Sequence, residues 1–384
     1  MSVDRPAYKI LYVDFARQTF RIGGGQIYLM NLLRGLDRQQ FRPYIYSLSD
    51  SEIFRDLPET HVIPRKRQFP ILDQFDAHGL HHLLSPYVLL QLIHWLICEG
   101  LTIRRIVSRE HIQLIHINGM LPLIVTCLSG LTFCVPTIYH VHHVIGSRTG
   151  RWLMDTFCCF VRKVLCVSAY VEHATLRRNK AKSIVIYNGI PIRETPPKTK
   201  TKTLIFAGSM IRMKGYPEFL SAIARIQDTL RKTGYHVECY GDGIDRPSIE
   251  QTIEAQGIGD IVQLKGFHAN VRDIMRHSRI VVNASIAPEG FGLTIVEGME
   301  AECLVIASCL GGPKEIIIDG KNGYLVDPRN ITALAARIED AVLHYEKRTA
   351  IRQAARATIC ERFDLEKHIQ QVEAIYQNLL SPRS

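Results

Sequence analysis

"IVVNASIAPEGFGLTIVEGMEAECLVIAS", residues 280–308, reads as a strand, a loop, a helix and a second strand in succession. Its two ends, residues 280–285 and 304–308, are short apolar runs of the kind that form buried strands. The residues between them are enough for a crossover helix, so the stretch predicts a β-α-β unit. A sheet built from such units is parallel, and its ligands bind beyond the carboxyl ends of the strands.

The loop of this unit carries two glutamates beside a predicted helix start. Two glycines flank Phe291 and exclude a helix interior there, because each glycine costs a helix about 1 kcal/mol, whereas a helix can begin near Leu293. Glu289 then lies in the loop and Glu297 one turn into the helix. A helix start favours phosphate, and a carboxylate accepts hydrogen bonds from vicinal hydroxyls. The alternative is two ordinary surface glutamates.

The same alternation of short apolar runs and helical stretches fills the rest of the chain and predicts two Rossmann-like halves. The other runs expected to be strands are YKILYVD (8–14), LIHI (114–117), PTIYHVH (136–142), KVLCVS (163–168), SIVIYNG (183–189), TLIFAG (203–208), HVECYGDG (236–243) and IVQLKGF (261–267).

Residues 191–202, PIRETPPKTKTK, are polar and proline-rich and form the predicted linker. We therefore expect a first domain over 1–190, a second over 203–362, and a C-terminal helix over 363–384. That helix is amphipathic, with apolar residues at helical spacing: Leu365, Ile369, Val372, Ile375, Tyr376 and Leu379.

Composition indicates an ordinary globular protein: of 384 residues, 46% are hydrophobic and 22% charged. The ten cysteines contain no CxxC pair, which argues against a zinc site or disulfide framework and for a reducing, cytoplasmic location. The N-terminus has no signal-peptide pattern.

Positive charge is concentrated in one half of the chain. Residues 1–195 hold 23 Lys and Arg against 14 Asp and Glu, whereas residues 196–384 hold 24 against 23. This excess predicts an anionic partner, such as a membrane surface, a phosphorylated lipid or a nucleic acid, or else serves only solubility. Nucleic acid is disfavoured because no aromatic-basic platform is present. The basic clusters are at 65–67, 162–163 and 177–182.

Two apolar stretches need a place in the fold. Residues 83–98 are too short for a membrane span, which takes about 20 residues, and contain Pro86 and His94. We expect a buried helix there, with an interfacial membrane helix as the alternative. Residues 120–135 predict a covered crossover helix.

Residues after three further strands carry candidate chemistry. Gly23, Gly24 and Gly25 precede a helix expected from about Ile27, an arrangement that suits phosphate or is merely a tight turn. Arg212 and Lys214 follow another strand near a helix start, where cations are unfavourable unless an anion binds; alone they would be a surface patch.

Histidines at 140, 142 and 143 end a further strand and could orient hydroxyls or carry a proton near neutral pH. A metal is disfavoured there, because neighbours on a strand point to opposite faces and no carboxylate or cysteine completes the set. Phosphate-seeking and hydroxyl-seeking groups at strand ends in both halves together indicate a nucleotide-sugar site.

The segment "EGFGLTIVE" followed by "VIASCLGGPKEIIIDGKNGYLVDP" resembles the signature of the retaining glycosyltransferases of family four, also called group 1. Their paired glutamates, with seven residues between them, match Glu289 and Glu297. The likeness also covers GGGQ, PTIYHVHH, YNGI, AGSMIRMKG, YGDG and LKGF. It implies the GT-B architecture: two Rossmann-like domains facing across a cleft, acceptor in the first, nucleotide-sugar donor mainly in the second, and a last helix crossing back.

The resemblance assigns roles by position. Transfer of a hexose from a UDP or GDP sugar, with retention and without a metal or other cofactor, would give an α-linkage to a glycan or lipid-linked acceptor in cell-surface polysaccharide or glycolipid synthesis. The implied catalytic residues are Glu289, His142 and Lys214. The implied acceptor contacts are Gln26 and His142. The implied donor contacts are Gly24, Gly25, Ser209, Arg212, Lys214, Gly290, Phe291, Gly292, Leu293, Thr294 and Glu297.

Three departures from the family pattern bear on the site. Ser209 stands where an arginine is common, so Arg212 would supply the charge or the phosphate grip is weaker. Glu302 and Leu304 replace a small residue and a proline, which changes a helix-to-strand turn, and Gln26 replaces a common glutamate. Alternatives are a non-catalytic sugar-nucleotide-binding subunit, a GT-B phosphorylase or an epimerase. A dehydrogenase is disfavoured by the spacing of the glycines.

Overall fold

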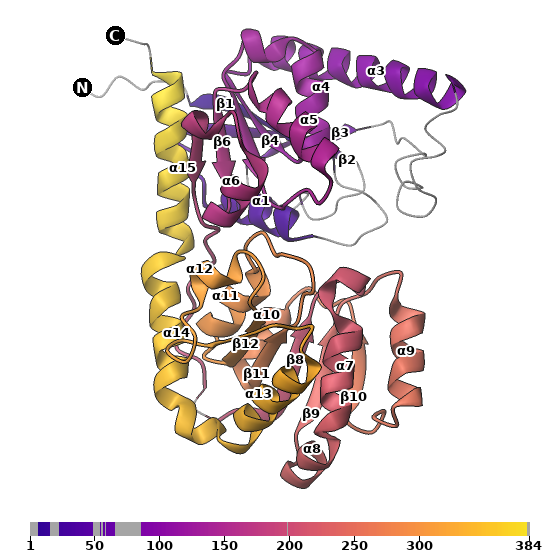
Figure 1. The fold of residues 1–384 in the computed structure, drawn as a ribbon. Helices are drawn as coiled ribbons and strands as arrows, with labels where there is room; N and C mark the ends of the chain where they lie inside the picture. The colour runs from indigo at the N-terminus through magenta and orange to yellow at the C-terminus, as the bar shows by residue number, and fades with distance from the viewer. Residues whose placement is uncertain are drawn as a thin grey trace, which may run out of the picture. The chain divides into compact units, whose positions relative to one another are not determined.

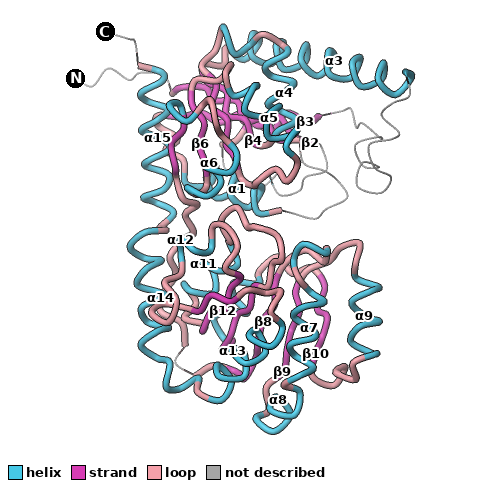
Figure 2. The backbone as a smooth tube through the Cα atoms, viewed as in Figure 1, coloured by secondary structure: helices cyan, strands magenta, loops and turns pink. Residues whose placement is uncertain are grey.

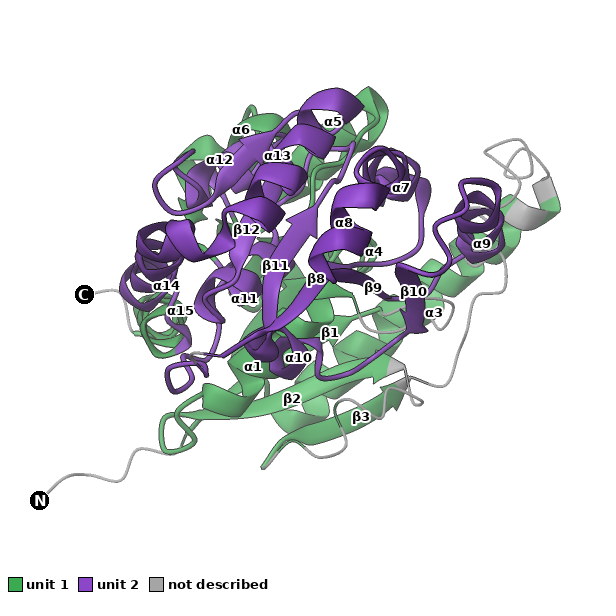
Figure 3. Ribbon diagram, turned by 90° about the horizontal axis from the view of Figure 1, so that it is seen from below, with its two compact units in different colours: residues 1–167, 171–187, 366–384 green, residues 168–170, 188–365 purple. Residues whose placement is uncertain are grey.

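The computed structural model describes residues 7–15, 23–48, 54, 57, 59–65, 86–197 and 199–381. The chain divides into two compact units, which Figure 3 colours separately. Unit 1 comprises residues 1–167, 171–187 and 366–384, and unit 2 comprises residues 168–170 and 188–365. The C-terminal segment therefore belongs to the same unit as the N-terminal sheet.

Unit 1 is built on a seven-stranded sheet in the order β3-β2-β1-β4-β5-β6-β7, and every pairing in it is parallel. Its strands are β1 (Tyr8–Asp14), β2 (Phe41–Leu48), β3 (His61–Arg65), β4 (Leu114–Asn118), β5 (Thr137–Val141), β6 (Lys163–Cys166) and β7 (Ser183–Val185). The central strands are buried, as expected for parallel strands covered on both faces.

Unit 2 is built on a six-stranded sheet in the order β10-β9-β8-β11-β12-β13, again entirely parallel. Its strands are β8 (Thr201–Ala207), β9 (His236–Tyr240), β10 (Val262–Gly266), β11 (Ser278–Asn283), β12 (Leu304–Ser308) and β13 (Tyr324–Val326).

Helices accompany the strands in both units, as Figures 1 and 2 show. In and beside unit 1 they are α1 (Gly24–Gly35), α3 (Pro86–Glu110), α4 (Met120–Leu128), α5 (Arg148–Cys158), α6 (Ala169–Thr175) and α15 (Leu365–Leu380). Unit 2 contains α7 (Tyr216–Arg225), α8 (Gln227–Thr233), α9 (Arg246–Ala255), α10 (Val271–His277), α11 (Leu293–Glu300), α12 (Pro313–Ile316), α13 (Ile331–Leu343) and α14 (Thr349–Arg362). Short 3-10 helices are η3 (Leu131–Phe133), η4 (Lys180–Lys182), η5 (Arg212–Lys214) and η6 (Tyr345–Arg348).

The alternation of side chains along each strand covers both faces of the unit 2 sheet. Residues of one parity on β8, β11 and β12 join one core with α7 and α13, including Phe206, Val282 and Ile306. Val281 has the other parity and lies under α11, where a Cβ built on Gly298 would come within 3.1 Å of it. Neighbouring side chains on a strand thus pack on opposite helical layers, which explains why these strands are apolar throughout.

The predicted two-sheet α/β architecture is confirmed, with helix 120–128 between its two strands. The chain also forms β2, β3 and β13, which the sequence analysis did not predict. Pro43 and Pro64 interrupt the first two, and β13 has only three residues. Proline in an apolar run argues against a strand, and β3 tolerates it as an edge strand.

The expectation of a buried helix at 83–98 is wrong. Residues 83–85 lie outside the described part of the chain, and α3 continues to Glu110. Only one side of it is buried, with Trp95 4% exposed, whereas Leu90 on the other side is 65% exposed. Among the described helices, none combines the length and apolar content needed to cross a membrane.

The order of the strands locates a candidate site in each unit. A parallel sheet opens a crevice where successive connections leave in opposite directions, beyond the strands' carboxyl ends. In unit 1 this point lies between β1 and β4, and in unit 2 between β8 and β11. The loops that follow these strands include most of the predicted site residues.

Candidate functional site

Lys214 and Glu289 form an ion pair at the switch point of unit 2. Lys214 Nζ lies 2.6 Å from Glu289 Oε1, and the glutamate side chain is 14% exposed. Lys214 ends η5, in the connection after β8, and Glu289 lies in the loop after β11. The two loops are neighbours because their strands are paired, which brings together residues 75 positions apart.

Glu289 is held in place by more than the lysine. Its Oε1 accepts hydrogen bonds from Ser285 Oγ at 2.5 Å and from Asn283 Nδ2 at 3.3 Å. Burial by itself would raise the pKa of Glu289, but the Lys214 charge and these hydrogen bonds outweigh it and keep the pKa below its ordinary value. Glu289 is therefore an ionised carboxylate in a fixed position at neutral pH.

The N-terminus of α11 adjoins this pair and presents free amides. Gly292 is its N-cap, with φ of 109°, and the first described backbone bonds in the helix run from Ile295 and Val296 to Gly292 O. Among the described residues, no acceptor is recorded for the N–H groups of Leu293 and Thr294. Such amides and the positive end of the helix dipole together favour an anion.

The loop before α11 is fixed by close backbone approaches. Glu289 N donates to Leu310 O, and Gly312 N donates to Glu289 O. A Cβ at Gly312 would lie 2.6 Å from Gly290 O, so that position requires glycine. The ring of Phe291 is buried and packs at 5.6 Å from Phe363, so this predicted donor contact offers its backbone rather than its ring.

Glu297 lies one turn into α11 and differs from Glu289 in its partners. It is half-buried, and no hydrogen bond to it is recorded within the described residues. Desolvation raises the pKa of Glu297 to about 7, although the charges of Arg272 and Arg193 oppose the shift. Its carboxyl group therefore changes charge within the physiological range and has its oxygens available for a ligand.

Arg212 does not share the position of Lys214, although both lie on η5. Its guanidinium forms a bidentate pair with Glu218 on α7 at 2.7 and 2.5 Å, and its side chain is 58% exposed. Both cations precede α7, which begins only at Tyr216, so they lie on the preceding 3-10 turn rather than in that helix. Both cations are thus paired with a glutamate, but only the partner of Lys214, Glu289, lies in the loop before α11.

In unit 1, helix α1 begins at Gly24, three residues earlier than expected. Gly23 is the N-cap, and its N–H donates to the side-chain oxygen of Gln26 at 2.9 Å. Gln26, a predicted acceptor contact, thus has a structural role in capping α1. The N–H groups of Gly24 and Gly25 have no acceptor recorded in the described part of the chain, so they can bind an anion.

Asn118 and Asp14 support this helix start and were missed by sequence reasoning. They end the paired strands β4 and β1, and Asn118 Nδ2 donates to Asp14 Oδ1 at 3.0 Å and to Gly25 O at 3.4 Å. Their position at the ends of two adjacent strands was the signal that could have identified them.

His142 lies against α1 as part of a buried aromatic cluster. A Cβ at Gly25 would be 3.4 Å from His142 Cδ2, so glycine there allows the close contact. The ring of His142 stacks on His140 at 4.3 Å and lies 4.8 Å from the ring of Tyr28. Neither ring nitrogen of His142 has a hydrogen-bond partner among the described residues.

Burial lowers the pKa of His142 to about 3, with neighbouring histidines adding to the effect. Of the two roles considered for this histidine, orienting hydroxyls suits it better than carrying a proton near neutral pH, because a neutral imidazole can donate or accept a hydrogen bond. His143 is exposed. Among the described residues, no group of His, Cys, Asp and Glu side chains could hold a metal.

The C-terminal helix α15 completes the cluster. His368 Nδ1 donates to Tyr187 O at 2.7 Å, and its Nε2 lies 3.3 Å from Tyr28 Oη. Tyr376 Oη lies 2.6 Å from His116 Nδ1 and 3.2 Å from Tyr12 Oη. The helix thus supplies polar partners to strands at the opposite end of the sequence.

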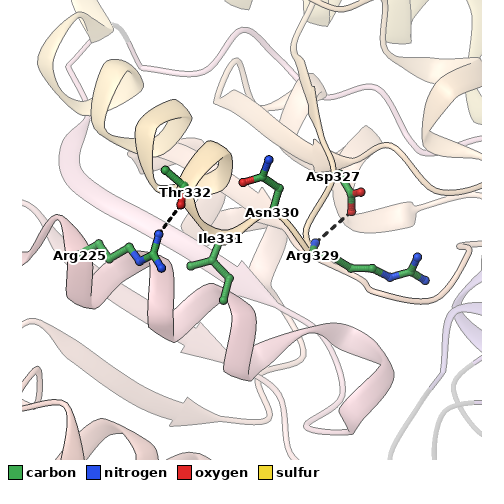
Figure 4. Close-up of a pocket in the computed structure, with 6 residues that line it drawn as sticks. All are labelled: Arg225, Asp327, Arg329, Asn330, Ile331 and Thr332. Carbon is green, nitrogen blue, oxygen red and sulfur yellow. Dashed lines mark hydrogen bonds between the residues drawn. The ribbon is translucent and has the colours of Figure 1, made fainter.

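A separate surface hollow lies in unit 2 and includes none of the predicted site residues (Figure 4). Its two arginines are engaged with protein groups: Arg225 donates to Thr332 Oγ1 at 2.5 Å, and Arg329 donates to Ile286 O at 3.2 Å. Its lining is Arg225, Asp327, Arg329, Asn330, Ile331 and Thr332. It carries no part of the site at the strand ends.

Comparison with known proteins agrees with this geometry. The family model for Glycosyltransferase Family 4 matches residues 22–194, and that for glycosyl transferases group 1 matches residues 191–358. An uncharacterised glycosyltransferase of Methanocaldococcus jannaschii is 26% identical over 93% of this chain and 95% of its own. The gpi3 subunit of phosphatidylinositol N-acetylglucosaminyltransferase from Schizosaccharomyces pombe is 27% identical over 56% and 50% of the two chains.

Among solved structures, Anabaena Alr3699/HepE in complex with UDP-glucose matches with a TM-score of 0.77 at 22% identity, covering 96% of this chain and 99% of that one. This similarity extends the family matches to the whole two-sheet architecture. The chain belongs to the group 1, or family four, retaining glycosyltransferases with the GT-B fold.

Proposed function

We propose that this glycosyltransferase moves a hexose from a nucleoside diphosphate sugar to a hydroxyl of a glycan or lipid-linked acceptor, forming an α-linkage. The observation that carries the proposal is the arrangement at the switch point of unit 2. There the Lys214–Glu289 pair adjoins the free N-terminus of α11, and Glu297 lies one turn further. UDP is the first nucleotide to test, because Alr3699/HepE was solved with UDP-glucose, and GDP is the second.

Each group suits one part of the donor. Lys214 and the amides of Gly292, Leu293 and Thr294 suit the diphosphate, because they supply positive charge in fixed positions. Ionised Glu297 suits the ribose hydroxyls as an acceptor of two hydrogen bonds. Glu289 suits the hexose, and the Gly24–Gly25 amides suit the diphosphate. In this proposal Lys214 and the helix-start amides supply the positive charge that faces the diphosphate, and no metal ion is given a role.

The proposed step breaks the bond between the anomeric carbon and the diphosphate oxygen, and the electron pair leaves with the nucleoside diphosphate. The acceptor oxygen forms its bond to the same face of the anomeric carbon, which preserves the configuration. Its proton passes to a phosphate oxygen of the leaving diphosphate. Lys214 stabilises the developing negative charge, Glu289 the positive charge on the sugar, and neutral His142 offers a hydrogen bond to hexose or acceptor.

The proposal also covers the kind of acceptor and the place where the enzyme acts. We assign a role in cell-surface polysaccharide or glycolipid synthesis at the cytoplasmic membrane face. Residues 1–195 carry 23 Lys and Arg against 14 Asp and Glu, which suits an anionic lipid-linked acceptor. The similar Schizosaccharomyces pombe subunit is named for an enzyme that acts on phosphatidylinositol.

Calorimetric titration with UDP-glucose and GDP sugars between pH 5.5 and 8.5, with EDTA present, tests the donor site. Because the pKa of Glu297 is about 7, its carboxylate forms as pH rises, and affinity for the correct donor should rise about tenfold. The donor diphosphate stays fully ionised across this range and contributes no titration. Glu297→Gln should abolish the rise, whereas Glu250→Gln, on the exposed side of α9, should keep it.

Donor hydrolysis by the same proteins, followed by product analysis, tests the reaction. Slow release of free hexose from one donor, reduced in Glu297→Gln, supports the transferase. Release of a sugar phosphate would instead indicate a phosphorylase, and an isomerised donor an epimerase. Tight binding without turnover on any acceptor would favour a non-catalytic binding subunit.

A further inference from the structure

Helix α3 has an apolar side that faces away from the core of its own unit. We call the exposed side chains Leu90, Ile93, Ile97 and Leu101 the α3 outer face; they are 65%, 45%, 56% and 48% exposed. Large apolar side chains repeated along one side of a helix indicate a contact surface, whereas scattered ones do not. Figure 1 shows the N-terminal half of α3 extending past the other helices of unit 1.

The spacing of these residues makes a continuous stripe. Positions three and four apart share a side of a helix, so the outer face runs along three turns of α3. Residues on the opposite side are buried in unit 1, among them Trp95, Ile103 and Ile106. The helix is thus apolar on two sides, and the core of unit 1 accounts for only one of them.

Two positively charged side chains follow the apolar stripe on the same side of α3. Arg104 and Arg105 follow Leu101 on the outer face and are exposed. The acidic residues of α3 lie elsewhere: Glu99 is buried, and Glu110 lies at the end of the helix, 3.4 Å from Arg109. Along the described part of α3, the outer face therefore combines apolar side chains with unopposed positive charge.

Exposed apolar side chains also lie near the end of α4, beside the C-terminal half of α3. Arg104 donates to Ser129 O at 3.0 Å, which places the C-terminal half of α3 beside the end of α4. Close to that end, Leu128 is 60% exposed and Phe133 is 75% exposed. Phe133 in turn lies 6.0 Å from the partly exposed ring of Phe160. The apolar surface of unit 1 is thus not confined to one helix.

We propose that the α3 outer face docks onto an anionic lipid bilayer, with α3 lying in the plane of the interface. A helix of 25 residues is about 37 Å long, and one with an apolar side bordered by arginines suits the boundary between headgroups and acyl chains. Anionic headgroups complement Arg104 and Arg105. A second copy of the chain would bring the same arginines and no acidic side chain on this face.

This inference rests on the proposed function only for the biological reason to bind a membrane, namely that a lipid-linked acceptor would be embedded in it. Binding to vesicles requires neither donor nor acceptor, so failure of one proposal leaves the other to its own test. The site residues at the ends of β8 and β11 are untouched by the variants below.

The experiment is co-sedimentation of the full chain with vesicles of phosphatidylcholine alone or with phosphatidylglycerol, at low and high salt. The variant Leu90→Gln/Ile97→Gln/Leu101→Gln should bind anionic vesicles at least tenfold more weakly than wild type. The control Ile244→Gln/Ile318→Gln/Leu343→Gln removes apolar side chains that are 71%, 54% and 55% exposed in unit 2, and it should bind like wild type. Arg105→Gln should weaken binding to anionic vesicles at low salt and leave binding at high salt unchanged.

Circular dichroism and thermal melting accompany each variant and establish that it is folded. Equal binding by wild type and the α3 variant would overturn the proposal. So would a wild type that ignores anionic lipid and instead sediments as a dimer that the α3 variant dissociates. If the α3 variant melts well below wild type, and wild type fails to bind vesicles, the outer face is covered by the chain itself and the proposal is also wrong.

Discussion

The two switch points use different chemistry within the same parallel scaffold. In unit 2 the site is a charged pair, Lys214 and Glu289, placed beside a free helix start. In unit 1 the corresponding region is a cluster of neutral rings, with His142 stacked on His140. One fold can therefore place an ion pair beside a helix start at one switch point and pack stacked histidine rings against a helix start at the other.

The largest expected effect separates the two units by their response to acid. Burial lowers the pKa of His116 and His142 to about 3 and that of His368 to about 4. In the unfolded chain each would titrate near its ordinary value of about 6.5. The unfolded state therefore binds more protons below that pH, and unit 1 loses about 1.4 kcal/mol per pH unit for each histidine as pH falls toward 4.

Hydrogen exchange between pH 7 and pH 4.5, corrected for intrinsic rates, measures this effect. Amides of β4, β5 and α15 should lose protection, while those of β8 and β11 lose less. Replacing His368 with Gln should flatten the pH dependence in unit 1. Equal losses in both units would show that the buried histidines do not control acid stability.

The next effect is a loss of catalysis at the charged site. Lys214→Ala should reduce kcat/KM for donor cleavage about 10²- to 10³-fold, as expected when a fixed group that stabilises transition-state charge is removed. Arg212→Ala, on the same 3-10 turn, is the matched control: its side chain is 58% exposed and its partner Glu218 lies on α7 rather than in the α11 loop, so the loss should be less than tenfold. Steady-state assays with one donor compare them, and equal losses would assign the phosphate charge to both cations.

The smallest effect concerns a backbone feature that both units share. His111 directly follows α3 with φ of 55°, and Glu302 lies two residues after the end of α11 with φ of 54°. In both places the backbone N–H of the next residue donates to a carbonyl of the helix, Ile112 N to Val107 O and Cys303 N to Gly298 O. This is the pattern of helices that end at a glycine in the left-handed conformation. Glycine accepts this conformation without strain, so His111→Gly and Glu302→Gly should each stabilise the protein by about 0.5 to 1 kcal/mol.

Urea unfolding monitored by circular dichroism measures this gain. Gly257→Ala, at a position with φ of 62° and open space around its Cβ, should lose stability by the same reasoning. A loss of stability in His111→Gly or Glu302→Gly would mean that the native side chain stabilises the protein by more than its backbone strain costs. Glu302 lies 3.9 Å from Arg356, so any such compensation is expected there first.

The grouping of candidate residues in unit 2 was easier to foresee from the sequence than the grouping in unit 1, for a physical reason. The groups around Glu289 and α11 come largely from one continuous loop and helix, so their spacing in the chain is also their spacing in space. The unit 1 cluster combines Tyr28, His116, His142 and His368 from four separate parts of the chain, and no local pattern connects them.

The prediction for α3 failed for a related reason. Its sequence is apolar on both sides, and periodicity cannot say which side meets a core. Central strands such as β4, β5 and β12 were predictable because burial on both faces requires apolar residues throughout. The ion pairing of Arg212 by Glu218 and the capping of α1 by Gln26 depended on side-chain geometry that spacing alone does not give.

The return of α15 to unit 1 also sets the order in which the protein can be completed during synthesis. Nearly all of unit 2 is continuous between residues 188 and 365, so it can fold as soon as that stretch has left the ribosome. Unit 1 is begun first, but it lacks His368 and Tyr376 until residues 366–384 have also been made. The half of the protein that is translated earliest therefore needs segments from both sides of unit 2, and until residues 366–384 have been made Tyr12 and His116 lack their partner Tyr376.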